Sequence, residues 1–541
     1  MRDRVSLAEV VAAAAITAGA IWLHSIAAAS AGALWRDEAN TLALSTYGGV
    51  RDIWANLQFD SFPILWPLLV RFYARAFGSI NDSAFRVVGF FTGLAVVAAL
   101  WLNAIVFRYR TPLVSLALFA LCPSVIKWGD SLRAYGLGIA IVLCAAALVW
   151  RFIQYPTLNR FAVAVIAATL SVHLLYYNAV LILAFVMAGI AVCVRRRDWQ
   201  RGKKVLVIGL IPAATMVPYV AVIRAAADWS PLVQIPDYSF AWFIAKLNQT
   251  LAPAGTWALA VWVAGMAVAI VIGVKYLADH RTRDIERSTD ADAVLFALVS
   301  LVVGSLGSYL FLDALSYVTQ PWYYLTLIAI VAVSMDIVFG VVAVKSLART
   351  MKVALALAVA LATLPVAGRT LRTQLTNVNS VASALERIAT PRDLVVVTPW
   401  HFGVSFNRYY HGRAPWITLP VVEFHEFHRY DLVKLAMEQP NQLTPISAAL
   451  ASARMTLAAG GKVYIAGIPG MSSSSGPVRL LGKAPASDGR WPEPEYQKQW
   501  TNAFAEYLKR HSHVVEVIRG SSSQTSHYED MALVAAEGWR P

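Results

Sequence analysis

Two adjacent carboxylates, Asp37 and Glu38, stand in the stretch Trp35-Arg-Asp-Glu-Ala39, directly after the first apolar segment of the chain. Acidic side chains at a membrane boundary are costly unless they are solvated, paired with a cation or functional. A carboxylate there can act as the general base that deprotonates an acceptor hydroxyl for attack on an anomeric carbon. The structural alternative is a solvated helix end in which Arg36 pairs with one acid, and these residues alone leave both interpretations open.

A second group of charges lies in the short stretch from Lys127 to Tyr135, between two apolar runs. It contains Lys127, Asp130 and Arg133 within seven residues. A phosphate leaving group needs fixed cations, and an arginine offers it a bidentate contact. Anchoring at the membrane interface by the aromatic residues and snorkelling cations is the equally weighted alternative.

A third pattern follows the acidic pair: Asp60-Ser-Phe-Pro63 and Trp66-Pro67, then Phe77-Gly78-Ser79 and Phe85-Arg86. By itself it predicts a loop followed by an amphipathic helix at the membrane surface.

The composition places these residues in a membrane protein. Of the 541 residues, 58% are hydrophobic and 14% charged, whereas soluble domains are about one quarter charged. The net charge of +14 lies in short clusters between apolar runs, which is typical of cytoplasmic loops and argues against nucleic acid as a partner. The three cysteines all fall inside apolar runs, so no disulfide framework or cysteine metal site is expected.

Apolar runs of suitable length predict about eleven membrane spans. The segment from Val5 to Leu34 is longer than the apolar core of a signal peptide, so we expect an uncleaved first span. The expected spans are Ala8–Ala31, Arg86–Phe107, Leu113–Ile126, Ala134–Phe152, Phe161–Tyr176, Ala179–Val194, Val205–Val222, Ala254–Lys275, Ala293–Leu312, Tyr324–Val344 and Val353–Val366.

Loop charge predicts the orientation of these spans. With the N-terminus inside, every expected cytoplasmic loop is basic, as the positive-inside rule requires. An odd number of spans then places the C-terminal region outside. The basic residues of the five loops are Arg108 and Arg110, Arg151 and Arg160, Arg195 to Lys204, Lys275 to Arg287, and Lys345 to Lys352.

Two regions outside the spans complete the expected architecture. The first extracytoplasmic loop, residues 34–85, mixes charges with aromatic residues and predicts interfacial helices at Arg51–Leu57 and Phe62–Phe77. From about Arg369 the composition becomes that of a soluble protein. We therefore expect a transmembrane domain over residues 1–368 and a soluble extracytoplasmic α/β domain over residues 369–541.

The α/β assignment of the second domain rests on alternating helix and strand patterns. A helix is predicted at Val378–Ile388, and buried strands at Asp393–Thr398, Lys462–Ile468 and Val514–Ile518. Pro469–Pro477, with its run of serines, predicts a loop.

The order and loop placement of the three patterns resemble bacterial members of the protein O-mannosyltransferase-like GT-C superfamily, which includes the lipid A aminoarabinose transferases. Those proteins carry an Asp-Glu pair at the start of the first extracytoplasmic loop, matching Asp37 and Glu38. Their Asp-x-His-Pro-Pro-Leu-Tyr-Tyr-like stretch is similar to the segment from Asp60 to Trp66. Their entry to the second span resembles Phe77 to Arg86, and the loop before the fourth span resembles Ser131 to Leu137.

The resemblance covers roughly the first 180 residues well, and the later spans by hydropathy only. It implies an inverting transfer from a polyprenyl-phosphate sugar, with Asp37 as the base. Arg86, Lys127 and Arg133 become candidate contacts of the donor phosphate. Further candidates for binding substrate or donor are Glu38, Asp60, Asp130, Tyr135, His173, Tyr323 and Tyr324.

Two departures from the family pattern matter. The family's histidine before the proline pair is Phe62 here. Its later Arg-Tyr-Leu-x-Pro loop appears as Gln320-Pro-Trp-Tyr-Tyr324, without the arginine. The donor phosphate must therefore be held differently near this loop, and the hydroxyls of Tyr323 or Tyr324 are candidates to replace the missing arginine.

Metal binding is left open by the sequence. A divalent cation such as Mg²⁺ or Mn²⁺ is compatible with the expected chemistry. His401, His411, His425 and His428 lack a clean metal-ligand spacing, and although Glu423, His425 and His428 offer ligands, surface histidines are the default expectation. His173 ends a span and is a candidate to line a sugar cavity, although an interfacial aromatic belt is the favoured interpretation.

The predicted function is thus a multi-pass enzyme of the bacterial inner membrane. It would transfer a sugar from a polyprenyl-phosphate donor to a glycan, glycolipid or protein acceptor, with the active site facing the periplasm. A transporter or flippase of lipid-linked substrates is the main alternative, although the charges lie at the outer boundary and no internal repeat is evident. A non-catalytic envelope scaffold is the third interpretation, and it predicts that Asp37 is dispensable.

Overall fold

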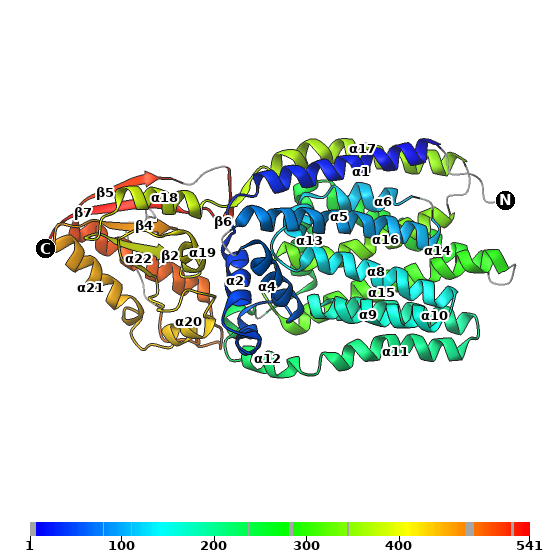
Figure 1. Cartoon of the computed structure of the whole chain (residues 1–541), viewed down its shortest axis with the longest axis horizontal. Helices are drawn as coiled ribbons and strands as arrows, with labels where there is room; N and C mark the ends of the chain where they lie inside the picture. The colour runs from blue at the N-terminus through cyan, green and yellow to red at the C-terminus, as the bar shows by residue number, and fades with distance from the viewer. Residues whose placement is uncertain are drawn as a thin grey trace.

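Long apolar helices form one part of the chain, and an α/β domain caps one end of them (Figure 1). The computed structural model describes residues 7–78, 81–109, 111–235, 237–280, 285–342, 346–470, 481–520 and 524–541. Ser79, Arg110, the cations Arg281, Arg283 and Lys345, and most of the expected Pro469–Pro477 loop lie outside these residues.

Eight helices in the described part of the chain are long and apolar enough to cross a membrane. Each of them coincides with a span expected from hydropathy, because a run of about twenty apolar residues satisfies its backbone in lipid only as a helix. They are α1 (Leu7–Ser30), α5 (Asp82–Phe107), α8 (Tyr135–Gln154), α10 (Asn178–Arg195), α14 (Ala258–Asp279), α15 (Ile285–Leu315), α16 (Leu325–Val342) and α17 (Ser346–Thr370).

The other three expected spans are short or interrupted helices, so by length and composition alone eight helices of the described residues, or nine with one bent pair, are long enough to cross a membrane. The helix α9 (Leu158–Leu174) has 17 residues. The pair α11 (Trp199–Thr215) and α12 (Tyr219–Ala226) bends by 54° at a break that ends in Pro218, and counts as one span at most. Residues 113–129 divide into α6 (Leu113–Ser115), the π-helical turn η2 (Leu116–Ala120) and α7 (Pro123–Gly129), because Pro123 starts a new helix.

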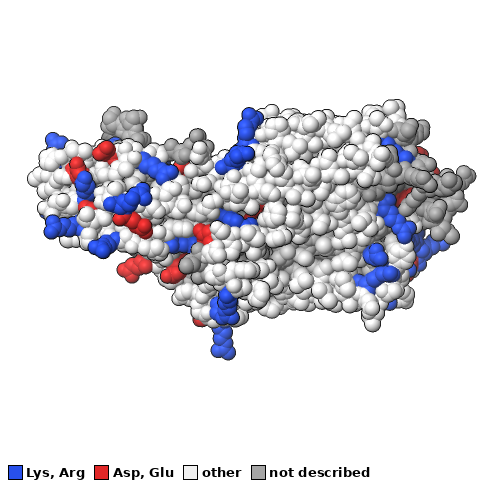
Figure 2. All heavy atoms as spheres, turned by 45° about the horizontal axis from the view of Figure 1, so that its top comes forward, with Lys and Arg blue, Asp and Glu red and all other residues white. Residues whose placement is uncertain are grey.

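The surface of the bundle agrees with a membrane environment. In Figure 2 the lysines and arginines lie toward the two ends of the bundle, and an uncharged belt separates them. Large apolar side chains of the long helices are exposed, among them Phe91 of α5, Val271 of α14 and Leu361 of α17. The chain is therefore a multi-pass membrane protein. The N-terminal end of α1 and the C-terminal ends of α10 and α14 lie at the end far from the α/β domain (Figure 1).

Short helices fill the boundary between the bundle and the α/β domain (Figure 1). The expected interfacial helices are present as α3 (Val50–Asn56) and α4 (Leu65–Phe77), while α2 (Arg36–Thr46) was not predicted. Further connecting helices are η1 (Leu57–Phe59), η3 (Ser230–Val233), α13 (Phe240–Leu251), η4 (Ala252–Ala254) and η5 (Pro321–Tyr324).

A five-stranded sheet of order β3-β2-β4-β7-β5 forms the centre of the α/β domain. Strands β3 (Trp416–Thr418), β2 (Leu394–Thr398) and β4 (Val463–Gly467) are parallel, and β7 (Ala532–Trp539) runs antiparallel to both β4 and β5 (Ser512–Arg519). The strands expected around residues 393–398, 462–468 and 514–518 are thus confirmed.

Helices cover both faces of this sheet, which explains why β2 and β4 read as continuous apolar runs. Alternate residues of β2 point to opposite sides: Val395 and Val397 pack with α18 (Val378–Ile388) and α19 (Phe402–Tyr409), and Val396 packs toward the other helices. Those helices are α20 (Tyr430–Met437), α21 (Thr444–Ala458) and α22 (Glu493–His511). A second, two-stranded parallel sheet joins β1 (Gln374–Thr376) to β6 (Thr525–Glu529) beside the bundle.

Close packing of α5 fixes the loop between α7 and α8. A methyl group on Gly89 would lie 1.9 Å from the backbone carbonyl oxygen of Asp130, and one on Gly93 would lie 2.4 Å from the Asp130 carboxylate. Because the obstacle at Gly89 is backbone, it cannot rotate away.

We therefore expect Gly89→Ala to push α5 from this loop and destabilise the protein by about 1–3 kcal/mol. Thermal melting of the purified protein in detergent measures the effect. Gly202→Ala on α11 is the control, since its methyl group would meet its nearest neighbour at an ordinary 3.5 Å. Equal melting temperatures for the two variants would contradict the prediction.

Candidate active site

The two adjacent acids lie in the first turn of α2. Trp35 precedes the helix in an extended conformation, and its N–H donates to Glu38 Oε2 at 3.2 Å. This is the backward half of a capping box, in which an acid at the third helical position satisfies a free N–H at the helix start. The first turn also favours negative charge because the helix dipole is positive there. Local chemistry thus explains why both acids begin the helix.

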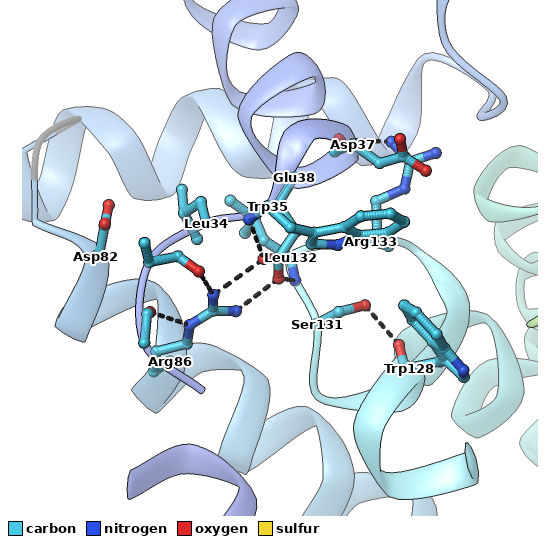
Figure 3. Close-up of polar contacts among 12 residues, drawn as sticks. Leu34, Trp35, Asp37, Glu38, Asp82, Arg86, Trp128, Ser131, Leu132 and Arg133 are labelled. Carbon is cyan, nitrogen blue, oxygen red and sulfur yellow. Dashed lines mark hydrogen bonds and ion pairs between the residues drawn. The ribbon is translucent and has the colours of Figure 1, made fainter. Parts of the chain in front are cut away.

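Glu38 is fully buried and tied to Arg86 of α5 (Figure 3). The guanidinium binds both carboxylate oxygens, at 2.6 and 2.9 Å, and the N–H of Leu132 donates to Oε1 at 2.7 Å. Arg86 also donates to the carbonyl oxygens of Gly32 and Ala33. These contacts therefore join the first turn of α2 to three segments: the end of α1, the start of α5 and the loop before α8.

Asp37 lies apart from that ion pair (Figure 3), since successive side chains of a helix point about 100° apart. Its side chain is 21% exposed, and Arg36 Nε lies 3.4 Å from Oδ1, a long contact. Of the two acids, Asp37 is the one whose carboxylate is accessible and weakly held.

Arg133 lies beside Asp37 and is held by several oxygens. Its Nη1 donates to the backbone oxygen of Asp37 at 2.9 Å and to Asp60 Oδ1 at 3.0 Å. Thr41 also contacts this nitrogen and bridges to Asp60 Oδ2. The guanidinium lies 4.3 Å from the ring centre of Phe62, at the position where the family's histidine was expected. Its buried Nε has no partner among the described residues, so one donor remains for a ligand.

Lys127 and Asp130 lie in a different environment. Lys127 Nζ donates to the backbone oxygen of Thr373 at 3.1 Å and lines a pocket of about 400 Å³, open mouth included. Asp130 accepts from His24 of α1 at 2.7 Å. Sequence reasoning did not name His24, because a lone histidine within an apolar run gives no signal of its partner. The remaining lining includes Ala27, Ala28, Ala31, Arg86, Ser131, Leu371 and Leu375.

The tyrosine and histidine candidates fall into two groups, those near Asp37 and those hydrogen-bonded elsewhere. Tyr135 is buried against the ring of Phe62, 5.3 Å between centres, and hydrogen-bonds Arg133. Tyr323 interacts electrostatically with Arg133 and Asp37, whereas Tyr324 is fully buried and bonded to Tyr238 and Thr319. Both ring nitrogens of His173 are bonded, to Tyr219 and Thr215. The structure thus brings Tyr135 and Tyr323 to Asp37 and engages the other two in packing.

The α/β domain contacts the same helix start. Glu529 Oε2 accepts from the N–H of Arg36 at 2.8 Å, next to Asp37. Arg408 and Tyr409 of α19 both bind Asp82 at the start of α5, each at 2.5 Å. Tyr528 packs against Trp35, Trp128 and Trp322, whose ring centres lie 5.3 to 6.0 Å away.

Two histidines of the α/β domain also lie near Asp37. His428 is 4% exposed, and its ring interacts electrostatically with Asp37, Arg36 and Arg133. Burial lowers the pKa of His428 to about 4 and that of His401 well below its ordinary value. The default expectation of a surface position is therefore wrong for His428. His425 contacts Trp416 instead, and within the described ranges no three His, Cys, Asp or Glu residues are placed to hold a metal ion.

Comparisons with known proteins define the fold class. No family model matches the chain, and no curated protein matches it. Solved structures do match at low identity, and they show what the fold is similar to.

The crystal structure of ArnT from Cupriavidus metallidurans bound to undecaprenyl phosphate matches with a TM-score of 0.50 and 12% identity, over 96% of this chain and 97% of that one. The Archaeoglobus fulgidus oligosaccharyltransferase tethered with an acceptor peptide has a TM-score of 0.46 and 12% identity, covering 93% and 72% of the two chains. Arabinosyltransferase EmbB from Mycobacterium smegmatis follows at 0.37 and 14%, covering 62% and 30%. The expected GT-C-like helical bundle with a C-terminal α/β domain is confirmed.

The Glu38–Arg86 geometry predicts that Arg86 holds the fold together. Arg86→Ala leaves a buried, unpaired carboxylate, which costs about 3–5 kcal/mol. Thermal melting should show this loss, and replacing both residues by methionine should recover most of it, because no charge then stays buried. A donor-phosphate role would instead weaken donor binding in Arg86→Ala without lowering the melting temperature.

Glu529 predicts a pH-dependent contact between the domain and α2. Burial raises the pKa of its carboxyl to about 7, against the hydrogen bond that Ser405 Oγ donates to Oε1, which lowers it. A raised pKa in the folded state means that this contribution is complete below about pH 4.5 and is lost as pH rises toward 7.

Glu529→Gln should therefore stabilise the protein at pH 8, by on the order of 3 kcal/mol, and leave it unchanged at pH 4.5. Melting curves at both pH values measure the difference. Glu537→Gln is the control, because that carboxylate is 43% exposed. An equal effect of Glu529→Gln at the two pH values would rule out a buried, protonated carboxyl.

Proposed function

We propose that this protein is an inverting glycosyltransferase that moves a sugar from a polyprenyl-phosphate donor to an acceptor hydroxyl, with Asp37 as the general base. The observation that carries the proposal is the separation of the two acids. Glu38 is neutralised by Arg86, whereas Asp37 is accessible, weakly held and next to a spare donor of Arg133. The match to a GT-C structure solved with undecaprenyl phosphate agrees with a donor of this class.

The chemical step follows from these positions. Asp37 takes the proton of the acceptor hydroxyl while that oxygen forms a bond to the anomeric carbon of the donor sugar. The bond from that carbon to the phosphate oxygen breaks, and the electron pair leaves with the polyprenyl phosphate. A cation near the leaving group stabilises its growing charge, and Arg133, whose Nε lacks a protein partner in the described structure, is suited to this contact.

The Lys127 pocket supports a position for the donor lipid. Its walls are alanines of α1 together with Leu371 and Leu375, and Lys127 supplies a positive charge. A cation at the end of an apolar wall suits a polyprenyl chain that carries a phosphate head. The positive-inside rule places the far end of the bundle in the cytoplasm. The site and the α/β domain would then face the periplasm from the inner membrane.

We expect Asp37→Asn to reduce sugar transfer by about 10²–10⁴-fold, because amides do not accept the proton. Purified protein is incubated with a panel of radiolabelled polyprenyl-phosphate sugars and bacterial membranes that supply acceptors. Asp228→Asn is the control, since its carboxylate is 71% exposed and pairs with Lys434.

Equal transfer by Asp37→Asn and wild type would remove the base assignment. Lack of transfer from every donor, together with flux of a lipid-linked sugar into vesicles, would favour a transporter.

A further inference from the structure

His428 extends from the α/β domain over the start of α2. Its backbone N–H donates to Asn40 Oδ1 at 2.7 Å. Asn40 follows Asp37 by three residues, and residues three apart share one face of a helix. The contact therefore fixes His428 over the face of α2 that carries Asp37, which agrees with the electrostatic interaction between their side chains.

The ring of His428 is oriented by a hydrogen bond to the backbone of His401. Its Nε2 is buried and has no hydrogen-bond partner in the described part of the chain, so the bonded nitrogen is Nδ1. A ring that donates through Nδ1 to a carbonyl is the tautomer whose Nε2 carries a lone pair. Nε2 of His428 is thus a buried hydrogen-bond acceptor without a donor among the described residues.

Packing leaves this ring little freedom. Trp400 meets it edge to face at 5.8 Å between ring centres, and Tyr430 lies 5.7 Å away. Trp400 Nε1 is itself bonded to Glu493, and Trp229 stacks on Tyr430 at 4.6 Å. A rigid, buried and unsatisfied acceptor is unfavourable, and a ligand hydroxyl removes that cost.

We infer that His428 Nε2 accepts a hydrogen bond from a second hydroxyl of the acceptor, next to the hydroxyl that Asp37 deprotonates. The inference rests on the proposed function and narrows its substrate. Two hydroxyls on one rigid frame describe a polyol such as a sugar ring. A serine or threonine side chain has one hydroxyl, and a phosphate oxygen would meet a lone pair and be repelled. The acceptor is therefore the sugar of a glycan or glycolipid.

The test compares two substitutions at His428 with a control. His428→Leu removes the lone pair, while His428→Gln offers a carbonyl oxygen near the position of Nε2. His411→Ala is the control, since His411 is an exposed histidine of the same domain. Melting curves establish that all three variants are folded.

Transfer is measured with a radiolabelled polyprenyl-phosphate sugar and bacterial membranes, varying donor and acceptor separately. We expect His428→Leu to raise the acceptor KM about tenfold and to leave the donor KM within about twofold. His428→Gln should recover most of the loss, and His411→Ala should match wild type. The label should appear in the glycan or glycolipid fraction. An unchanged acceptor KM in His428→Leu, or label in the protein fraction, would overturn the inference.

A binding measurement separates failure of this inference from failure of the proposed function. The glycan and glycolipid fraction of the same membranes is titrated into each variant, and tryptophan fluorescence reports occupancy beside Trp400. If wild type transfers no sugar but binds this fraction, and His428→Leu binds it about tenfold more weakly, the subsite stands and the transferase proposal fails. Equal binding by wild type and His428→Leu overturns the subsite, whatever the transfer assay gives.

Discussion

The buried ion pair between Glu38 and Arg86 is the contact on which the geometry of the site depends. A carboxylate without exposed surface needs a cation and several hydrogen bonds, and Glu38 receives two from Arg86 and others from Trp35 and Leu132. Those partners belong to three different segments. Satisfying one charge therefore sets the start of α2 against α5 and against the loop that carries Arg133, and Asp37 follows as the neighbour of Glu38.

The α/β domain contacts the bundle at the same place, the start of α2. Glu529 accepts from the N–H of Arg36, and His428 donates its backbone N–H to Asn40, so the two contacts lie about one helical turn apart around Asp37. Together with the hydrogen bonds of Arg408 and Tyr409 to Asp82, they fix the domain against the starts of α2 and α5. The domain consequently completes the walls around Asp37.

Local patterns predicted more of this structure than of its site. Apolar runs located all eight long helices, and strand patterns located β2, β4 and β5, because burial on both faces leaves a direct mark on composition. Three of the expected spans are short or interrupted helices, since apolar content does not show that Pro218 bends a helix or that Pro123 starts another. The sequence also made Glu38 and Arg86 candidates for binding the donor or substrate. It could not show that the two form an ion pair, because they are forty-eight residues apart.

Pairing across the chain also decides which acid can do chemistry. Asp37 and Glu38 both lie in the first turn of a helix, and although Glu38 caps that turn, the local sequence does not show which acid is neutralised. Arg86 is the partner of one, so the other is left to the solvent and to ligands. The same logic applies to His428, which looks like a surface histidine until Asn40 and His401 fix both its backbone and its ring. In this protein, a residue becomes available for chemistry because distant residues satisfy its neighbours and leave its own polar atom unsatisfied.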